Sequence, residues 1–404
     1  MTRATAWAGA ATAVIGVLAA SLLLGMPAAY SQGRQASAAQ SAGRQASGRS
    51  SAAVVPLLAY YYIWFNVDSW NRAKTDYPLA GRYSSDNSTV MRKQIEEAKS
   101  AGISGFIVSW KDTRTDDRRL RLLMAVARQE HFKLAMIYEG LDFYRHPLPV
   151  TEVAAAFKTF KNDFAGDPVF YRLGGKPLTI WSGTWDYSHA DVATVTSAVR
   201  GSMLVLSTEK NVKGFMRIAD VTDGDAYYWS SVNPSTNTDY AAKLDEMSKV
   251  IHHDRKYWIA PFAPGFDARL VGGHRVVARD GGQTLRTEYA IAVRSSPDAL
   301  GLISWNEFSE NSYVEPSRKY GSQSLAVLRD LRGTPVPAPP AATDSSTPSG
   351  RPAASIWPNV LRLAGFVVVL VLSVALIGLL RQFTAKRRLS MSSAKHSGDS
   401  PDLR

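Results

Sequence analysis

The stretch Gly301–Pro316 reads GLISWNEFSENSYVEP, and both the fold and the chemistry of the chain are best approached from it. Residues 300–304 form a short apolar run that indicates a buried β-strand. This run leads directly into four residues of a different kind, Trp305, Asn306, Glu307 and Glu310. Because ionised carboxylates lose hydration at the end of a core strand, they need either partners or a function there. The stretch therefore predicts a functional site at the end of a buried strand.

Glu307 and Glu310 are the candidate catalytic residues of this stretch. They are three positions apart, so in a helical or turn conformation their side chains point the same way. Two carboxyl groups that face one cleft suit glycoside hydrolysis, in which one acts as the acid and the other as base or nucleophile. The same spacing is common on solvated helix surfaces, so an acidic turn without a catalytic role stays open on spacing alone.

Apolar runs like this one recur along the chain and alternate with helical patterns. The runs predict eight buried strands, at residues 54–63, 105–110, 133–138, 177–181, 203–207, 225–229, 256–262 and 300–304. A helical pattern lies in nearly every gap, and parallel neighbours need such a crossover. No Gly-x-Gly-x-x-Gly follows the first run, which disfavours the alternative of an open doubly wound sheet. We therefore predict an α/β fold, a (β/α)8 TIM barrel, over residues 54–332.

The barrel prediction selects further candidate residues, because chemistry in this fold gathers at the carboxyl ends of the strands. Aromatic side chains at several strand ends suit the apolar faces of sugar rings. Any single Trp, however, is more often part of the core. Glu139 is a third carboxylate expected in the pocket, with a salt bridge to a neighbouring loop as its alternative. The predicted substrate-binding residues are Trp64, Trp110, Tyr138, Glu139, Trp229, Trp305 and Asn306.

The composition excludes several classes of protein. The chain has 404 residues and no cysteine, so disulfides, zinc fingers, iron–sulfur clusters and thiol nucleophiles are excluded. Its net charge of +12 is typical of a nucleic-acid partner. Much of the excess charge lies outside the predicted barrel, in Arg34, Arg44, Arg49, Arg381, Lys386, Arg387 and Arg388. We therefore expect no nucleic-acid binding.

Two motifs contain residue types that can bind a metal. Asp223-Gly224-Asp225 is similar to the Asp-x-Asp pair of metal-dependent glycosyltransferases, but two acids around a glycine before a strand more often form a turn. His252 and His253 have no third ligand at a useful spacing, and cations are favoured at a helix carboxyl end in any case. We predict neither a metal nor another cofactor.

The two ends of the chain predict export and a membrane anchor. Residues 1–31 have the charged start, apolar middle and small-residue exit of a secretory signal peptide, and residues 32–53 have the composition of a disordered spacer. Residues 333–358 form a Pro/Ala/Ser-rich linker, and the uncharged run within residues 359–381 is long enough for a transmembrane helix. The basic tail at residues 382–404 places the C-terminus in the cytoplasm and the barrel outside a cell membrane crossed once.

The motif Trp305–Glu310 with Tyr313–Pro316 resembles the strand-eight motif of the glycoside hydrolase family 99 endo-α-mannosidases and their relatives. Residues 98–110 resemble the first helix and second strand of that family, and Tyr138-Glu139 resembles its third-strand carboxylate. The resemblance covers roughly residues 57–331. It implies a (β/α)8 barrel that cleaves internal α-mannosidic linkages with retention and without a metal.

The resemblance also implies roles for the two glutamates. Glu307 would be the base that assists attack by the substrate's own 2-hydroxyl, and Glu310 would be the general acid and then the base. Relatives usually carry Trp and His at positions 308 and 309 and Gly at 311, where this chain has Phe308, Ser309 and Asn311. These departures concern the sugar more than the reaction, so an α-glucan-cleaving hydrolase is the alternative. A non-catalytic carbohydrate-binding surface protein is a second one, and an envelope glycosyltransferase a third.

Overall fold

The computed structural model describes residues 54–229 and 231–335. The predicted signal peptide, spacer, transmembrane helix and tail lie outside these residues, as does nearly all of the predicted linker. Over the described ranges, no helix has the length and apolar character needed to cross a bilayer.

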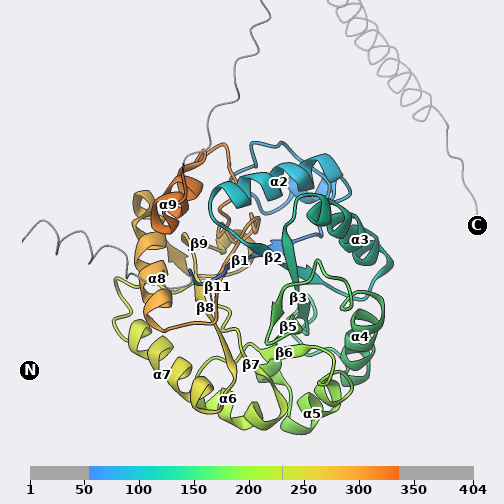
Figure 1. The fold of residues 1–404 in the computed structure, drawn as a ribbon. Coiled ribbons are helices and arrows are strands. Elements are labelled where there is room, and N and C mark those ends of the chain that lie inside the picture. Colours follow the sequence, from blue (N-terminus) through green and yellow to red (C-terminus); the bar gives the residue numbers. More distant parts are fainter. Residues whose placement is uncertain (1–53, 230, 336–404) are drawn as a thin grey trace, which may run out of the picture. The chain divides into compact units, whose positions relative to one another are not determined.

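Eight parallel strands close into a barrel, which confirms the predicted α/β barrel fold (Figure 1). Each strand pairs with the next, and the last pairs with the first through Leu57 and Leu300. The barrel strands are β1 (Leu57–Tyr62), β2 (Gly105–Trp110), β3 (Lys133–Glu139), β5 (Lys176–Ser182), β6 (Leu204–Ser207), β7 (Gly224–Asp225), β8 (Tyr257–Phe262) and β11 (Ala299–Leu302). Three short strands lie outside the ring, β4 (Arg172–Leu173), β9 (Phe266–Asp267) and β10 (Val276–Val277).

Helices cover the outside of the barrel and follow the strands in alternation (Figure 1). Several begin at polar caps, as at Asn87, whose side chain accepts from the N–H groups of Thr89 and Val90. The helices are α2 (Ser88–Ser100), α3 (Arg114–Gln129), α4 (Val150–Asp163), α5 (His189–Ser197), α6 (Val212–Ile218), α7 (Tyr240–His253), α8 (Gln283–Arg294) and α9 (Gln323–Arg332). Short 3-10 turns add η1 (Val67–Asn71), η2 (Thr184–Asp186), η3 (Ala219–Val221), η4 (Arg269–Val271) and η5 (Asp280–Gly282).

The sixth barrel strand differs from its prediction at residues 225–229. Only Gly224 and Asp225 pair in the sheet, and the chain leaves it at Ala226. Gly224 has φ of 153°, and a Cβ there would lie 2.0 Å from the carbonyl oxygen of Tyr257. A glycine is therefore required where β7 meets β8.

Side chains on each strand alternate between the barrel interior and the surrounding helices. On β1, Leu58 and Tyr60 belong to the interior cluster, whereas Tyr61 belongs to the layer under the helices. The same alternation on β2 and β3 sends Ile107 and Ile137 inward. The inner rows continue to the carboxyl end of the barrel through Tyr62, Ser109 and Glu139, which places polar groups there.

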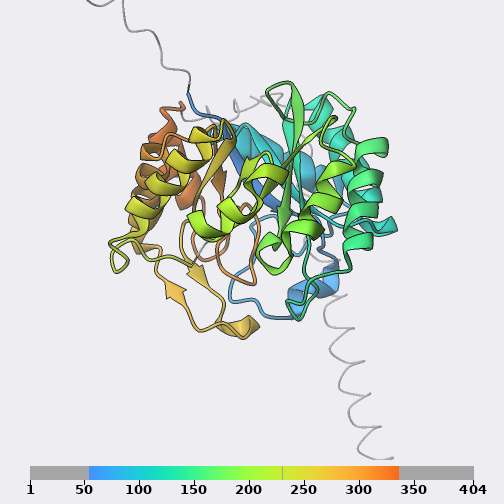
Figure 2. The ribbon, with the colours of Figure 1, turned by 90° about the horizontal axis from the view of Figure 1, so that it is seen from below.

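The two ends of the barrel carry different structures (Figure 2). The β9–β10 hairpin and the 3-10 turn η1 lie at the carboxyl end of the strands, at the bottom of that view. The described part begins and ends at the other end, where Leu300 donates its N–H to the carbonyl of Pro56 and Thr334 lies against Gly102. The described chain therefore enters and leaves the barrel at the amino ends of the strands.

Candidate active site

The loop that follows β11 holds Glu307 in one position. Ser304 accepts the N–H of Glu307 through its Oγ at 2.8 Å, and the Glu307 Oε1 accepts the N–H of Ser309 at 2.8 Å. The loop then folds back, since Ser304 donates its N–H to the carbonyl of Ser312 at 2.8 Å. Glu307 is almost fully buried. Residues 308–311 form a turn rather than a helix.

Glu310 is positioned by its backbone and by the residue that follows it. Its carbonyl accepts the N–H of Asp267 from the β9–β10 hairpin at 2.7 Å. Asn311 has φ of 52°, a left-handed conformation that asparagine tolerates better than most residues. The Asn311 side chain donates to the carbonyl of Asp267 at 2.9 Å and accepts from the Thr75 hydroxyl at 2.7 Å. Asparagine thus replaces the glycine of the resembled motif and adds two bonds between the loops.

The two glutamates differ in how firmly they hold a proton. Burial, followed by the negative charge of Glu307, raises the pKa of Glu310 to about 8. Burial also raises the pKa of Glu307, but the hydrogen bond from Ser309 and the positive charge of Lys74 oppose that rise. Glu307 is therefore the member of the pair that ionises first, and Glu310 keeps its proton at neutral pH.

Lys74 is a member of the site that the sequence did not single out. Its Nζ donates to the Ser309 hydroxyl at 2.7 Å and to the carbonyl of Arg72 at 3.1 Å. Burial lowers the pKa of Lys74, and the charge of Glu307 opposes that shift. A lysine in the loop between β1 and α2 has no distinguishing sequence signal, so only the fold brings it to Glu307.

A pair of tyrosines lies among the carboxylates. The hydroxyls of Tyr62 and Tyr228 form a hydrogen bond with each other. Burial and then contact with Tyr228 raise the pKa of Tyr62, and the charges of Glu307, Glu139 and Glu310 raise it further. The same three carboxylates raise the pKa of Tyr228. Since all of these charges act on both phenols, the five groups share one site at the carboxyl end of the barrel.

Glu139 reaches this site from the end of β3. It is half-buried, and the Ser109 hydroxyl donates to its Oε1 at 3.2 Å. Burial raises the pKa of Glu139, while hydrogen bonds from Ser182 and Ser109 and the charge of Lys111 oppose the rise. Glu139 forms no salt bridge with the described residues.

Three predicted substrate-binding aromatic residues lie in the core instead, and this corrects the expectation for them. Trp110 donates its Nε1–H to Asp117 of α3 at 2.9 Å and packs on Phe160. Tyr138 packs on Phe157 of α4, with ring centroids 5.7 Å apart. Trp305 is fully buried and packs on Phe106. Trp110 and Tyr138 point toward the surrounding helices, because they alternate with the inward side chains of β2 and β3, and Trp305, which follows β11, belongs to the same core layer.

Asn306 is also unavailable to a substrate. It is fully buried, and its side chain accepts from the Tyr62 N–H at 2.8 Å and donates to the Tyr62 carbonyl at 3.0 Å. Its amide nitrogen donates further to the Tyr83 hydroxyl at 3.2 Å. Asn306 therefore replaces a strand partner for β1 and fixes the start of the loop that carries Glu307 and Glu310.

Two of the predicted aromatic residues do lie near the carboxyl end. Trp64 is 45% exposed and stacks on Tyr62, with ring centroids 4.3 Å apart. Trp229 is half-buried and lies 5.9 Å from the guanidinium carbon of Arg275. The sequence selected Trp229 as the aromatic end of its strand, whereas its neighbour Tyr228 is the residue that faces the carboxylates.

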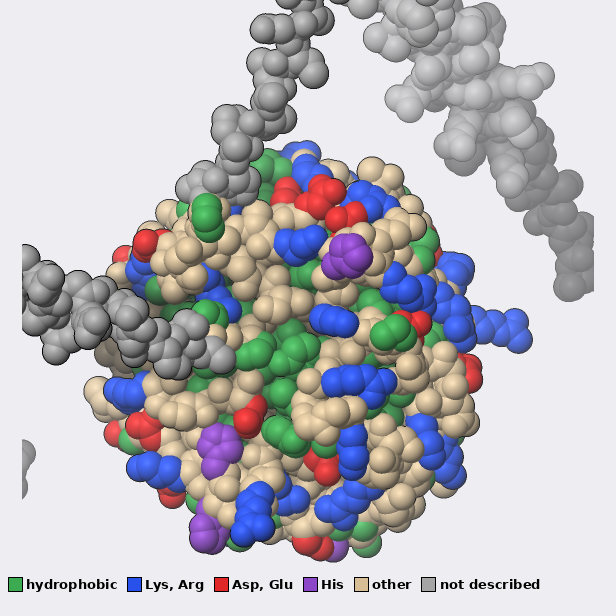
Figure 3. Space-filling model, viewed as in Figure 1, with side chains coloured by type: hydrophobic (Ala, Val, Ile, Leu, Met, Phe, Trp, Pro, Cys, Tyr) green, Lys and Arg blue, Asp and Glu red, His purple; other side chains and the backbone are tan. Residues whose placement is uncertain are grey.

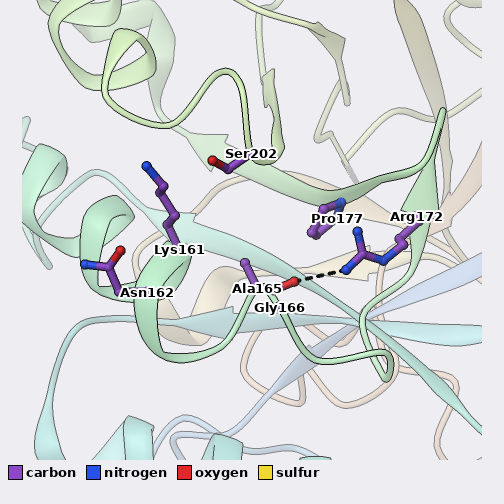
Figure 4. Close-up of a pocket in the computed structure, with 7 residues that line it drawn as sticks. All are labelled: Lys161, Asn162, Ala165, Gly166, Arg172, Pro177 and Ser202. Carbon is purple, nitrogen blue, oxygen red and sulfur yellow. Dashed lines mark hydrogen bonds between the residues drawn. The ribbon is translucent and has the colours of Figure 1, made fainter.

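Two hollows of the described part lie away from these residues. One, of about 350 Å³, lies near the amino ends of β5 and β6 and is lined by Lys161, Asn162, Ala165, Gly166, Arg172, Pro177 and Ser202 (Figure 4). It contains no carboxylate or aromatic ring. Figure 3 shows the same end of the barrel, where Lys and Arg side chains are spread around hydrophobic ones near the centre of the view. The second hollow lies between α6 and α7. Neither hollow is lined by a residue of the candidate site.

The candidate metal ligands all lie within residues 54–229 and 231–335. No group of three or more His, Cys, Asp or Glu side chains in these ranges is arranged to hold a metal ion. Asp223 instead accepts the N–H of Val205, and Asp225 accepts the Ser207 hydroxyl and the N–H of Glu209. Both carboxylates therefore accept hydrogen bonds from groups in or next to β6.

Comparison with known proteins gives a family and a fold. The family model described as Glycosyl hydrolase family 71 matches residues 79–328. No curated protein matches the chain. A GH99 endo-alpha-mannosidase structure from Bacteroides thetaiotaomicron, in complex with BIS-TRIS-propane, is 20% identical, with a TM-score of 0.61 over 69% of this chain and 98% of that one. A second structure of that protein is 18% identical with a TM-score of 0.60 at the same coverage. At such identities the likeness establishes a shared barrel fold alone.

Proposed function

The chain belongs to glycosyl hydrolase family 71 and is a glycoside hydrolase, and on this premise we propose that it cleaves internal α-1,3 linkages of a glucan. The family match favours the α-glucan alternative over α-mannan as the substrate. The observation that carries the proposal is the pair of carboxyls at the carboxyl end of the barrel: the pKa of Glu310 is raised to about 8, whereas Ser309 and Lys74 oppose the rise in the pKa of Glu307. Opposite protonation states are what a base and an acid of glycoside hydrolysis require.

Glu310 is the general acid in this proposal. Its pKa of about 8 keeps it protonated at neutral pH. It gives this proton to the glycosidic oxygen as the bond from that oxygen to the anomeric carbon breaks. Glu307 is the base, because Lys74 and Ser309 favour its ionised form.

The sugar decides which hydroxyl Glu307 deprotonates. In an α-mannoside the 2-hydroxyl lies on the ring face opposite the leaving group and can attack the anomeric carbon from behind. In an α-glucoside the 2-hydroxyl lies on the same side as the leaving group and cannot. For a glucan, Glu307 therefore takes a proton from water, whose oxygen attacks the anomeric carbon, and the product is inverted.

An α-mannan hydrolase that acts with retention is the second candidate. The resemblance of Trp305–Glu310 to the family 99 motif favours it. The two candidates pair different substrates with different stereochemistry, so each makes a double prediction. A glucan substrate goes with inversion, and a mannan substrate goes with retention.

The remaining groups of the site would bind the sugar. We assign Glu139, Tyr62 and Tyr228 to hydrogen bonds with hydroxyls of the reacting unit, since all three share the site with Glu307 and Glu310. Trp64 offers an exposed ring face beside Tyr62 for a neighbouring unit. Trp229 is the further candidate for stacking.

One digestion experiment tests the proposal. The full chain is incubated with α-1,3-, α-1,4- and α-1,6-glucans and with α-mannan, and proton NMR follows the anomer of the first product. We expect release of β-configured reducing ends from α-1,3-glucan and none from E310Q. Cleavage of α-mannan with α-configured products would support the second candidate instead. Calorimetric binding of a glycan without any turnover would favour the non-catalytic alternative.

The location of the enzyme is part of the proposal. We propose an exported barrel anchored by one transmembrane helix within residues 359–381, with the tail in the cytoplasm. The support is the sequence of the two ends, and the described chain leaves the barrel opposite the catalytic residues, so a tether there would not cover them. Protease added to intact cells should remove the barrel domain. Protection of the barrel until the cells are lysed would contradict the export.

A further inference from the structure

Two aromatic side chains stand in solvent on the loop between β3 and α4. Phe143 is 94% exposed and Tyr144 is 75% exposed, more than any other large hydrophobic residue in the described ranges. Their rings meet edge to face, with centroids 5.7 Å apart and planes at 86°. In that arrangement each ring leaves a face uncovered. Exposed apolar rings that do not contribute to the core point to a ligand.

The loop is held in shape by hydrogen bonds. An antiparallel bridge joins Leu141 and Pro147, and Asp142 accepts the N–H of His146 with its Oδ1 at 2.8 Å. The N–H of Arg145 bonds the carbonyl of Asp142 at 3.1 Å, with Arg145 at a positive φ of 70°. These hydrogen bonds therefore hold the backbone that carries both rings before a ligand binds. Binding then requires little additional ordering of the loop.

The base of the loop is tied to neighbouring strands. Lys111 at the end of β2 donates its Nζ to the carbonyl of Leu141 at 3.1 Å. Gly140 donates its N–H to the carbonyl of Ser182 at the end of β5, and the Tyr187 hydroxyl bonds the carbonyl of Leu148 at 3.0 Å. These contacts fix the loop to the carboxyl end of the barrel.

The loop starts beside the catalytic carboxylates. Phe143 is four residues after Glu139, so the two Cα atoms lie within about 14 Å of each other. Arg145, the next residue after the ring pair, lowers the pKa of both Glu310 and Glu139 through its charge. The rings thus stand at the rim of the same end of the barrel, within a few sugar units of the reacting bond.

We propose that Phe143 and Tyr144 form a stacking platform for pyranose rings of the polysaccharide chain, away from the unit that is cleaved. The proposal rests on the proposed function as a polysaccharide hydrolase. The apolar faces of sugar rings match the two uncovered ring faces, and the flanking Asp142, Arg145 and His146 can bond the hydroxyls at the sugar edges. Two rings flanked by charged side chains are too small and polar a surface for a stable protein partner.

The test measures binding separately from turnover. Affinity for long α-1,3-glucan chains is measured by calorimetry on the full-length protein with E310Q as the background, with and without F143A/Y144A. We expect affinity to fall about tenfold, the size expected for the loss of one or two ring contacts. F143W/Y144W should restore it, because tryptophan also offers a ring face. M216A removes a side chain that is 52% exposed on α6 and should leave affinity unchanged.

Turnover then locates the platform relative to the cleaved bond. With Glu310 intact, F143A/Y144A should lower the ratio of kcat/KM on long chains to kcat/KM on the shortest cleaved oligosaccharide about tenfold. Equal loss on both lengths, or unchanged affinity of the Ala variant for the polymer, would overturn the proposal. A failure of the proposed function looks different, because the unaltered protein would then hydrolyse no α-glucan of any length.

Discussion

Two glutamates of the same loop, Glu310 and Glu315, have a raised pKa but different surroundings. Burial raises the pKa of each to about 8. Glu315 accepts hydrogen bonds from the Tyr83 hydroxyl and from the Gln94 Nε2, both at 2.8 Å, and is almost fully buried. Glu310 is half-buried, and within the described residues no donor bonds its carboxyl.

The difference distinguishes a carboxyl with a structural role from one that is available for a reaction. The carboxyl of Glu315 completes a network in which Tyr83 also bonds Asn306, and Gln94 also accepts from the Tyr61 hydroxyl. This network fixes the loop that carries Glu307 and Glu310 to β1 and α2. Glu310 shares its site with Glu307, Glu139 and two tyrosines, all of which titrate. A raised pKa therefore does not identify a catalytic acid unless the group also has free bonding capacity and access.

The largest expected effect is the loss of activity in E310Q. Removing a general acid lowers kcat by about 10² to 10⁴, because the leaving oxygen then departs unprotonated. Thermal unfolding should change little, since the amide keeps the shape and removes a group that burial disfavours as an anion. Steady-state kinetics and calorimetry on the same preparation check both. An E310Q variant with full activity would place the acid elsewhere.

The second effect extends the comparison to the aromatic residues. W110A should lower the free energy of unfolding by about 3–5 kcal/mol, because it empties a core site between β2, α3 and α4. W64A is the matched variant at the exposed ring and should leave stability unchanged while it weakens substrate binding. Denaturant titration and KM measured at a temperature where both variants are folded check the pair. If W64A lost stability and W110A stayed stable but bound substrate more weakly, the alternation of side chains along β2 would be contradicted.

The third effect concerns Glu315 itself. E315L should cost about 1–3 kcal/mol of stability, because it leaves Tyr83 and Gln94 buried without their partner. Its kcat should fall far less than that of E310Q. The ratio of these two losses measures how separate the network and the site are. If folded E315L lost as much kcat as E310Q, the hydrogen-bond network of Glu315 and the site of Glu310 would not be separate.

The pH dependence of stability sharpens the same point. The pKa of Glu315 is higher in the folded than in the unfolded chain, so folding binds a proton, and its contribution is complete below the unfolded pKa and is lost as pH rises through about 8. Stability should therefore decline from about pH 5 to pH 8, and E315Q should show a shallower decline. Chemical denaturation at several pH values measures both slopes. Identical slopes would mean that Glu315 is already ionised in the fold.

The smallest effect is a shift in the activity profile of K74M. Lys74 favours the ionised form of Glu307, so its removal raises the pKa of Glu307 and moves the acidic limb of the kcat/KM profile to higher pH. The alkaline limb, which reports Glu310, should move less. K213M on α6 changes an exposed lysine away from the site and serves as the control. An unmoved acidic limb would remove Lys74 from the electrostatics of the pair.

The fold was readable from the sequence because barrel strands and their crossover helices repeat one pattern. Seven of the eight strand positions follow directly from apolar runs of fitting length. The exception is β7, where only Gly224 and Asp225 pair in the sheet and the apolar run that follows them has left it, which no periodicity shows.

The site was readable only where chemistry and strand position agree. Glu307, Glu310 and Glu139 combine a carboxyl with a strand end. Trp110 and Tyr138 also follow that rule, but the inward position belongs to Ser109 and Glu139, and the alternation within each strand could have shown this. Lys74 and Arg145 come from loops, whose path depends on contacts far apart in sequence.

The central claim is that Glu310 protonates the leaving oxygen, and one measurement tests it directly. The kcat/KM of the unaltered chain and of E310Q is followed against pH on glycosides whose leaving groups differ in acidity. We expect a large loss in E310Q for sugar leaving groups, a small loss for acidic phenol leaving groups, and no alkaline limb near pH 8 in E310Q. An equal loss for every leaving group, with the alkaline limb preserved, would contradict it.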